Sequence, residues 1–348
     1  MSDPSFQNDY HQGGHPEVLK ALVEGNHTYD AGYGLDVYSQ QAQALLRKQL
    51  GNQKADVHFI SGGTQVNKIV ASLLKPYEAI IAPTTGHINV HESGAVEAGG
   101  HKIIAVATTD GKLTPLHIRQ IIDAVEDEHT VIPRAVFIAN ATELGTMYSL
   151  TELKALRVSC RKHKLYLYVD GARLGQALVS KKAHMTLKNM AQLCDAFYIG
   201  GTKNGALFGE ALVLIHDDFK DNFRNVLKQH GALLAKGKFM GIQFLALFKK
   251  GLYMRLATHA QMQAAKLTQE LKKQGHRFLV DSETNQIFPV FKKRDAVALQ
   301  KKYKFFLWKE LSNDVVAVRF VTSWSTKNSE IDALLKECAK YEPVQVSK

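Results

Sequence analysis

The sequence has few cysteines: three in 348 residues, Cys160, Cys194 and Cys338. Because they are widely spaced and odd in number, they argue against a disulfide framework and against a cysteine metal site. This usage is typical of a reducing compartment, and we therefore expect a cytoplasmic protein.

Long apolar runs are also missing. No stretch approaches the length that a membrane-spanning helix needs. The first twelve residues, MSDPSFQNDYHQ, have neither the basic nor the apolar region of a secretory signal. With 45% hydrophobic and 22% charged residues, the composition is that of an ordinary globular protein. We expect no membrane partner.

A third absence concerns nucleic acids. Lysine and arginine (44) exceed aspartate and glutamate (33), which gives a net charge of +11 at pH 7. The charges are scattered, however, and the chain has no arginine-rich arm and no aromatic RNA-binding signature. We expect no nucleic-acid partner, because a basic surface is equally suited to attracting small anionic substrates.

The chain alternates between strand-like and helical segments. Helices have recognisable starts, such as Thr114 followed by Pro115 and the capping-box pair Ser149 and Glu152. This alternation predicts an α/β domain with a mainly parallel sheet. The predicted strands are apolar almost throughout, as expected when helices cover both faces of a sheet; they span 57–61, 78–82, 102–107, 135–140, 165–170, 196–200 and 210–215.

The last two of these strands differ from the rest. Only nine residues, 201–209, join them, which is too few for a helical crossover, so we predict antiparallel neighbours. Lys203 then lies in a tight loop at the carboxyl end of strand 196–200. Open α/β sheets place ligands at this edge.

From about residue 220 the pattern changes. A long helical region, predicted to be two helices linked through 231–240, precedes short strands and a closing helix from about Ser329 to Tyr341. We predict a large domain over 1–244, with an N-terminal arm over 1–14, and a small α+β domain over 245–348. The short strands predicted here are 278–282, 286–291, 304–308 and 315–324.

The usual nucleotide motifs are absent: the chain has neither a Walker loop nor a G-x-G-x-x-G fingerprint. Between strand 57–61 and the next helix stands Gly62-Gly63-Thr64. Small residues, free backbone N–H groups and the helix dipole favour a phosphate there. A simple capped turn without a ligand is the alternative interpretation of the same three residues.

Other polar residues also follow strand ends. Asp170, with Arg173 behind it, is either an Asp-Gly turn or a carboxylate for a buried cation. His87 and His91 form an H-x-x-x-H pair, but no HExxH motif and no third ligand accompany them. We therefore expect no metal, and favour a histidine packed against a flat ligand or in the core. Arg319 lies on an apolar strand face and requires a buried anion, from the protein or from a ligand.

Taken in order, these features are a phosphate-sized glycine loop, a histidine, an aspartate with a nearby arginine, and a lysine. That set suits pyridoxal 5'-phosphate (PLP). A lysine amine forms a Schiff base with the PLP aldehyde, and a carboxylate pairs with its pyridinium nitrogen. We predict PLP as the cofactor.

The chain also resembles the threonine aldolase / β-eliminating lyase family of fold-type-I PLP enzymes over most of its length. The resemblance implies an α/β fold of the aspartate aminotransferase type, with a mainly parallel seven-stranded sheet and a smaller C-terminal α+β domain. It also implies an amino-acid substrate, and a homodimer or homotetramer whose site borrows residues from a neighbouring subunit. The matching segments are FQND, AGYGLDVYSQQAQALL, SGGTQVN, GHINVHESG, YVDGARLGQAL, GGTKNG and VRFVTSW.

The resemblance assigns cofactor contacts to particular residues. It implies that Lys203 forms the Schiff base, that Asp170 pairs with the pyridine nitrogen and that His87 stacks on the ring. Gly63 and Thr64 would hold the phosphate.

On the substrate side the resemblance implies that Arg173 serves the ring hydroxyl and the substrate carboxylate. Arg319 would bind the same carboxylate. Asn8, in FQND, is a further candidate for substrate binding, and Tyr33 is a candidate for the residue that a neighbouring subunit contributes.

Two positions depart from the family pattern. The segment that usually carries a phosphate-binding arginine reads GALLAKGKFMG, so Lys236 is the predicted substitute and Lys238 the alternative. Glu143, in NATELGT, replaces the usual histidine near the substrate β-hydroxyl. We predict that Glu143 accepts the β-hydroxyl proton; the alternative is that it caps the turn.

The preferred reaction is retro-aldol cleavage of a β-hydroxy-α-amino acid, such as L-threonine, to glycine and an aldehyde. A PLP-dependent β-elimination from another β-substituted amino acid is the alternative. A basic binding protein without catalysis is an alternative of another class.

Overall fold

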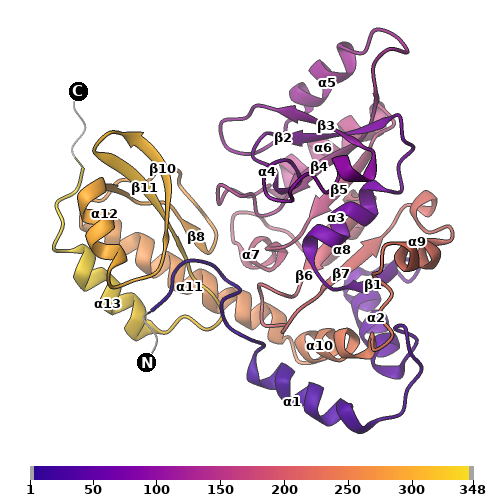
Figure 1. Cartoon of the computed structure of the whole chain (residues 1–348), viewed down its shortest axis with the longest axis horizontal. Helices are drawn as coiled ribbons and strands as arrows, with labels where there is room; N and C mark the ends of the chain where they lie inside the picture. Colours follow the sequence, from indigo (N-terminus) through magenta and orange to yellow (C-terminus); the bar gives the residue numbers. More distant parts are fainter. Residues whose placement is uncertain (1–3, 345–348) are drawn as a thin grey trace.

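The computed structural model describes residues 4–344 and contains a larger and a smaller unit side by side (Figure 1). The larger unit is built on a seven-stranded sheet in the order β1-β7-β6-β5-β4-β2-β3. All seven predicted strands are present: β1 (Asp56–Ile60), β2 (Glu78–Pro83), β3 (Lys102–Val106), β4 (Ile132–Ala139), β5 (Tyr166–Asp170), β6 (Ala196–Gly200) and β7 (Glu210–Leu214).

The direction of the strands agrees with the short connection between the last two. Strands β2 to β6 pair in parallel. Strand β7 pairs antiparallel with both β6 and β1. The sheet is therefore mainly parallel, as predicted.

Helices cover both faces of this sheet (Figure 1). Thr114 and Ser149 cap the helices that they were predicted to begin. The helices of this part of the chain are α1 (Pro16–Glu24), α2 (Val37–Leu50), α3 (Gly63–Ala71), α4 (His87–Val90), α5 (Pro115–Asp123), α6 (Leu150–Lys162), α7 (Leu174–Val179) and α8 (Leu187–Leu193), with short 3-10 turns at Gly25–His27, Glu97–Gly99 and Asp217–Phe219.

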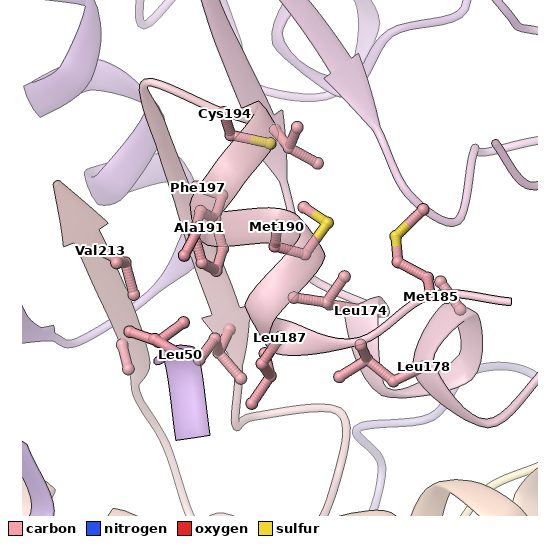
Figure 2. Packing of buried hydrophobic residues seen from close by; sticks show 14 of the residues in the cluster. Leu50, Leu174, Leu178, Met185, Leu187, Met190, Ala191, Cys194, Phe197 and Val213 are labelled. Atoms are coloured by element: carbon pink, nitrogen blue, oxygen red, sulfur yellow. The ribbon is translucent and has the colours of Figure 1, made fainter. Parts of the chain in front are cut away.

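Alternate residues of the strands enter two separate hydrophobic clusters, one on each face. Figure 2 shows part of one face, where Phe197 of β6 and Val213 of β7 lie near Leu187 and Met190 of α8. Residues from both faces of these strands are buried, which explains their continuous apolar sequences.

The helical region after residue 220 differs from the prediction. It contains three helices, not two: α9 (Phe223–Gln229), α10 (Lys238–Lys249) and α11 (Leu252–Lys273). The predicted link through 231–240 is present, but a second break follows α10. Gly251 there adopts a left-handed conformation with φ of 67°, which glycine tolerates and which ends the preceding helix.

The smaller unit contains a four-stranded sheet, in which β10, β11 and β8 are neighbours and β9 also pairs with β11. The prediction of a strand at 278–282 was wrong, because only Phe278 makes an isolated bridge, to Pro289. The predicted strand 286–291 is split, since Pro289 has no N–H to donate to a ladder. The elements are β8 (Gln286–Ile287), β9 (Val290–Lys292), α12 (Lys293–Gln300), β10 (Phe306–Ser312), β11 (Val315–Val321) and α13 (Asn328–Cys338).

The N-terminal arm packs into this smaller unit. Phe6 belongs to its hydrophobic core. The Phe6 N–H donates to Lys304 O (2.7 Å), and the Val321 N–H donates to Phe6 O (2.8 Å). Helix α11 contributes Leu256 to the core of the larger unit and Leu267 to that of the smaller one. The domain division after residue 244 therefore stays a proposal.

The three cysteines are buried and free. Within residues 4–344, no helix combines the length and the apolar character needed to cross a membrane.

Candidate active site

The large sheet brings the predicted site residues to one edge. Because β1 and β6 both run antiparallel to β7, they point the same way, and β2, β4 and β5 are parallel to β6. Their carboxyl ends therefore share an edge. Gly63 follows β1, His87 follows β2, Glu143 follows β4, Asp170 ends β5 and Lys203 follows β6.

A cavity of about 490 Å³ opens at this edge. Five of the predicted site residues line it, and they come from both units of the chain. The lining residues are His87, His91, Glu143, Arg173 and Lys203 of the larger unit, Gln286, Phe306, Leu307, Trp308 and Arg319 of the smaller unit, and Tyr10 of the N-terminal arm.

Lys203 reaches the cavity from the loop between β6 and β7. Burial lowers the pKa of its amine, and repulsion from Arg173 lowers it further. The loop after β5 lies directly against β6: a Cβ on Gly171 would be 1.7 Å from Tyr198 O. A glycine is therefore required for this close approach. The lowered pKa favours the neutral, nucleophilic form of the amine.

Asp170 is 4% exposed and lies at the end of β5. Its carboxylate accepts hydrogen bonds from the Tyr198 hydroxyl (2.6 Å), the Asn67 side-chain amide (3.1 Å) and the Ala172 N–H (3.0 Å). Among residues 4–344, no lysine, arginine or histidine forms an ion pair with it. Asp170 is thus a buried carboxylate that lacks a cationic partner from the described chain.

His87 begins α4, and its ring is held from behind by a carboxylate. Nδ1 lies 2.8 Å from Glu92 Oε1. The rings of His87 and His91 are tilted, with centroids 5.5 Å apart. Across the described range 4–344, no three histidine, cysteine, aspartate or glutamate side chains gather in a way that could hold a metal ion.

Glu143 lines the cavity beside His87. Its Oε1 accepts the His87 backbone N–H at 2.8 Å, while Oε2 is buried and has no hydrogen-bond partner in the described structure. Burial, reinforced by the negative charge of Asp170, raises the pKa of this carboxyl to about 7. This carboxylate bonds to the start of α4 and not to its own turn, and in the described structure it does so with one oxygen only.

Arg173 lines the cavity but is already paired. It forms a two-pronged ion pair with Asp9 of the N-terminal arm, through Nε to Oδ2 (2.8 Å) and Nη2 to Oδ1 (2.9 Å). Asp9 also accepts a hydrogen bond from the Asn285 amide (2.9 Å). Asp9 therefore joins the arm, the larger unit and the smaller unit at the cavity wall.

Arg319, unlike Arg173, has no carboxylate partner among the described residues. Its guanidinium lies 4.6 Å from the centre of the Trp308 ring and 5.1 Å from that of Phe306. The Nε atom is buried without a partner, and within residues 4–344 no carboxylate forms an ion pair with Arg319. Burial, together with repulsion from Arg173, lowers its pKa to about 10. Of the two alternatives for this arginine, an internal ion pair is not formed.

The glycine loop after β1 forms an open helix start. No side chain caps α3, whose N-cap is Gly62, so the first N–H groups of the helix are not used by a capping side chain. A Cβ on Gly63 would lie 2.9 Å from the Tyr198 hydroxyl. The loop thus has the shape and the donors that an anion needs.

Six predicted residues do not line the cavity: Asp170, Gly63 and Thr64, which lie at the same sheet edge, and Asn8, Tyr33 and Lys236. The Asn8 carbonyl Oδ1 accepts the Tyr10 N–H (3.0 Å) and so shapes the arm beside the cavity. Tyr33 is 42% exposed, and Lys228 Nζ lies 4.9 Å from the centre of its ring. Lys236 is exposed.

The alternative to Lys236 is already bonded within the chain. Lys238 Nζ donates to Thr28 O (2.7 Å) and lies 3.5 Å from Asp30 Oδ2. The loop before these lysines does contact the start of α3, where the Gln65 amide donates to His230 O (3.2 Å). The role predicted for Lys236 stays a prediction.

Sequence reasoning missed several residues of the site. Asp9 stands next to Asn8 in FQND, and Glu92 stands within GHINVHESG, so both lay inside segments that had been singled out. Gln286 and Trp308 come from short strands of the smaller unit, and Tyr10 from the N-terminal arm. No local pattern marks these three.

These groups fit PLP. An unpaired buried carboxylate suits the pyridinium nitrogen, an uncapped helix start suits the phosphate, and a partly buried amine at the cavity suits the aldehyde. Together with the strand order, these groups define the class of the protein: an α/β enzyme of PLP fold type I.

The chain belongs to the β-eliminating lyase family. The model of that family, described as β-eliminating lyase, matches residues 6–294. The low specificity L-threonine aldolase of Pseudomonas sp. (strain NCIMB 10558) is 32% identical over 345 residues, covering 96% of this chain and 97% of the relative. The corresponding aldolase of Pseudomonas aeruginosa is 30% identical, with coverage of 95% and 96%.

Comparison with solved structures supports the same assignment. The threonine aldolase of Leishmania major superposes with a TM-score of 0.95 at 43% identity, covering 97% of this chain and 98% of that one. Mouse CSAD has the same fold, with a TM-score of 0.76 at 18% identity over 98% of this chain. PLP, predicted from the motifs, is the cofactor of this family.

Proposed function

We propose that this chain is a lyase that cleaves a β-hydroxy-α-amino acid, L-threonine or a relative, to glycine and an aldehyde. The similarity to two bacterial low specificity L-threonine aldolases and to the threonine aldolase of Leishmania major supports this reaction. The observation that carries it is Glu143, whose unpaired buried oxygen lies on the cavity wall with Lys203 and Arg319.

Residues at the strand ends would hold the cofactor. Lys203 would bind the PLP aldehyde through its amine, and Asp170 would face the pyridine nitrogen. His87 would lie against the ring, with the phosphate at Gly63 and Thr64. When bound, PLP draws electrons from the bond to Cα that stands perpendicular to its ring.

Arg319 would bind the substrate carboxylate. It is the arginine at the cavity that makes no ion pair among residues 4–344, whereas Arg173 is neutralised by Asp9. A carboxylate held at Arg319 restricts rotation about Cα and so selects the bond that breaks. Arg173 would add a hydrogen bond to the carboxylate or to the ring hydroxyl.

Glu143 would act as the base. With a pKa of about 7, a substantial fraction of the carboxyl is ionised at neutral pH and yet basic enough to accept a proton. The β-hydroxyl proton would pass to Oε2 as the Cα–Cβ bond breaks and the aldehyde forms. Oε1, held by the His87 N–H, would keep the group in place.

We also propose a cytoplasmic homodimer or homotetramer, with Tyr33 and Lys236 facing a neighbouring copy. Large apolar side chains are exposed around α1 and the segment that follows it, which supports burial against a second copy. These residues are Leu19, Val23, Tyr29, Leu35 and Val37.

Product analysis tests the reaction. The purified chain, loaded with PLP and given L-threonine, should form glycine and acetaldehyde in equal amounts. A keto acid and ammonia would identify β-elimination instead. A protein that retains no visible absorbance after unbound PLP has been removed would favour a binding protein without catalysis.

Glu143→Gln tests the base. The substitution keeps the shape but removes the acceptor, so threonine cleavage should fall by about 100-fold or more. Exchange of the glycine α-proton needs no β-hydroxyl base and should largely survive. Glu126→Gln, an exposed glutamate, is the control. Near-normal values for both activities would show that Glu143 is structural.

A further inference from the structure

Glu92 is a buried carboxylate that none of these roles uses. It follows α4, is 5% exposed as a residue, and its side chain is fully buried. In the described structure no lysine or arginine forms an ion pair with it. Its Oε1 instead lies 2.8 Å from His87 Nδ1 and 2.6 Å from the Asn67 amide nitrogen, and Oε2 has no partner.

Asn67 continues this contact towards the sheet edge. Its amide nitrogen donates to Glu92 Oε1 and also to Asp170 Oδ2 (3.1 Å). Its carbonyl Oδ1 accepts from the Tyr168 hydroxyl (2.6 Å). Both hydrogens and the oxygen of the amide are therefore used, and they fix its orientation.

The result is a continuous line of hydrogen bonds from His87, through Glu92 and Asn67, to Asp170. The two ends of this line are the residues proposed to contact the cofactor ring, one on its face and one at its nitrogen. A group at the centre of the line can therefore set both contacts at once.

We propose that Glu92 is the positioning residue for the cofactor ring. Its Oε1 lies within hydrogen-bond distance of His87 Nδ1 and accepts there, so it holds the His87 proton on Nδ1 and fixes the orientation of that ring. Through Asn67 it also holds the Asp170 carboxylate in one orientation. This inference rests on the cofactor contacts proposed above for His87 and Asp170.

The unfavourable free energy of burying the Glu92 carboxylate supports a positioning role. In the described structure no lysine or arginine pairs with this buried carboxylate and one of its oxygens has no partner, which makes its burial unfavourable. An apolar side chain of similar size would fill the same volume at lower cost. What such a side chain cannot do is accept hydrogen bonds from His87 and Asn67 together.

Two substitutions at Glu92 separate hydrogen bonding from simple packing. Glu97→Gln, at an exposed glutamate nearby, is the matched control. Glu92→Leu removes the acceptor, and we expect the Kd for PLP to rise by about 10- to 100-fold. The visible circular dichroism of bound PLP should weaken because the ring is held less firmly. Glu92→Gln keeps an acceptor oxygen and should lie closer to the wild type.

Steady-state kinetics should show an effect on kcat and little effect on KM. In Glu92→Leu saturated with PLP, kcat for threonine should fall while KM stays within about twofold, because Arg319 still binds the carboxylate. Partial recovery of kcat in Glu92→Gln distinguishes a hydrogen-bonding role from simple packing.

A readout without cofactor is the ring of His87 in the apo chain. Nitrogen NMR, with the signal assigned by comparison with His87→Asn, should show the proton on Nδ1 in the wild type and a mixture of tautomers in Glu92→Leu. If Glu92→Leu fails to fold, Glu92→Met, which has the length of glutamate but no acceptor oxygen, takes its place: the proposal requires weaker visible dichroism or an altered His87 signal.

The proposal is wrong if Glu92→Leu, or Glu92→Met in its place, binds PLP within twofold of Glu97→Gln and leaves the His87 signal unchanged. This outcome is separable from a failure of the proposed reaction. A chain that makes no glycine from threonine would refute the reaction, but the PLP affinity and the His87 tautomer would still report on Glu92.

Discussion

The two walls of the cavity are built in different ways. The wall from the larger unit presents polar groups at strand ends that bond to one another, as His87 does to Glu92 and Asp170 does to Asn67. The wall from the smaller unit presents Arg319, which forms no ion pair among residues 4–344, beside the rings of Phe306 and Trp308.

This difference separates chemistry from recognition. A bonded network fixes groups in place, which the reacting centre of a cofactor needs. An unpaired cation with apolar neighbours leaves its binding capacity free for a ligand. Substitutions in the first wall should therefore act mainly on kcat, and those in the second mainly on KM.

Lys203→Ala should have the largest effect. It removes the amine that holds the cofactor, so activity should fall by about a thousandfold or more, and the visible band should be lost. The melting temperature should not fall, because the substitution removes an amine whose burial is unfavourable. Lys154→Ala, on the exposed face of α6, is the control. Borohydride reduction that labelled another lysine would overturn the assignment.

Asp170→Asn should come next. It keeps the size of the side chain but removes the charge opposite the pyridine nitrogen, which should lower kcat by about 100- to 1,000-fold with PLP still bound. Steady-state kinetics at saturating PLP measure this. Normal turnover would mean that the first wall does not carry the chemistry.

Arg319→Ala tests the second wall. Loss of a charged contact in a partly dry site costs about 2–5 kcal/mol, so KM should rise by about 30-fold or more for every amino acid tested. The Kd for PLP should hardly change. Arg294→Ala, exposed on α12, controls for loss of positive charge. Loss of PLP with unaltered KM would instead place Arg319 at the phosphate.

The pH profile provides a prediction of intermediate size. A base must be ionised, and the Glu143 pKa is raised to about 7, so kcat/KM for threonine should rise about tenfold per pH unit below 7 and then level off. Glu143→Gln should remove this step. A wild-type profile with no inflection near 7 would exclude Glu143 as the base.

The same carboxyl affects stability, with the opposite sign. Because its pKa in the folded chain lies above the ordinary value of 4.5, the folded state binds the proton more tightly. The free energy of unfolding should therefore fall as pH rises from about 4.5 to 7. Urea unfolding of Glu143→Gln against the wild type should show that this part of the loss is absent.

Trp308→Leu should have the smallest effect. The ring contributes about 1 kcal/mol to holding the guanidinium, so KM should rise about fivefold with kcat unchanged. In an Arg319→Ala background the same substitution should have no effect, because the two residues act together. An equal effect in both backgrounds would mean that Trp308 contacts the substrate by itself.

The sequence predicted the first wall far better than the second. Strand ends of a parallel sheet converge on one edge, so Lys203, Asp170, His87 and Glu143 could be brought together from the strand pattern and the family motifs alone. The seven strands themselves were recognisable because both faces are buried.

The rest depended on contacts between distant segments. Asp9 pairs with Arg173, 164 positions away, and Trp308 comes from a short, largely exposed strand that local periodicity describes poorly. Glu92 lay in a motif, but its function depends on Asn67 and His87, which only the folded chain brings together.

The packing of Phe6 also constrains the order of events during synthesis. The arm bonds to residues that leave the ribosome about 300 positions later: Arg319 donates to Gln7 O across 312 residues. Phe6 and Gln7 therefore gain these partners only near the end of synthesis, and the core of the smaller unit can close only then. Because Tyr10 reaches the cavity on this same arm, we expect the cavity wall to be complete only once the smaller unit has folded.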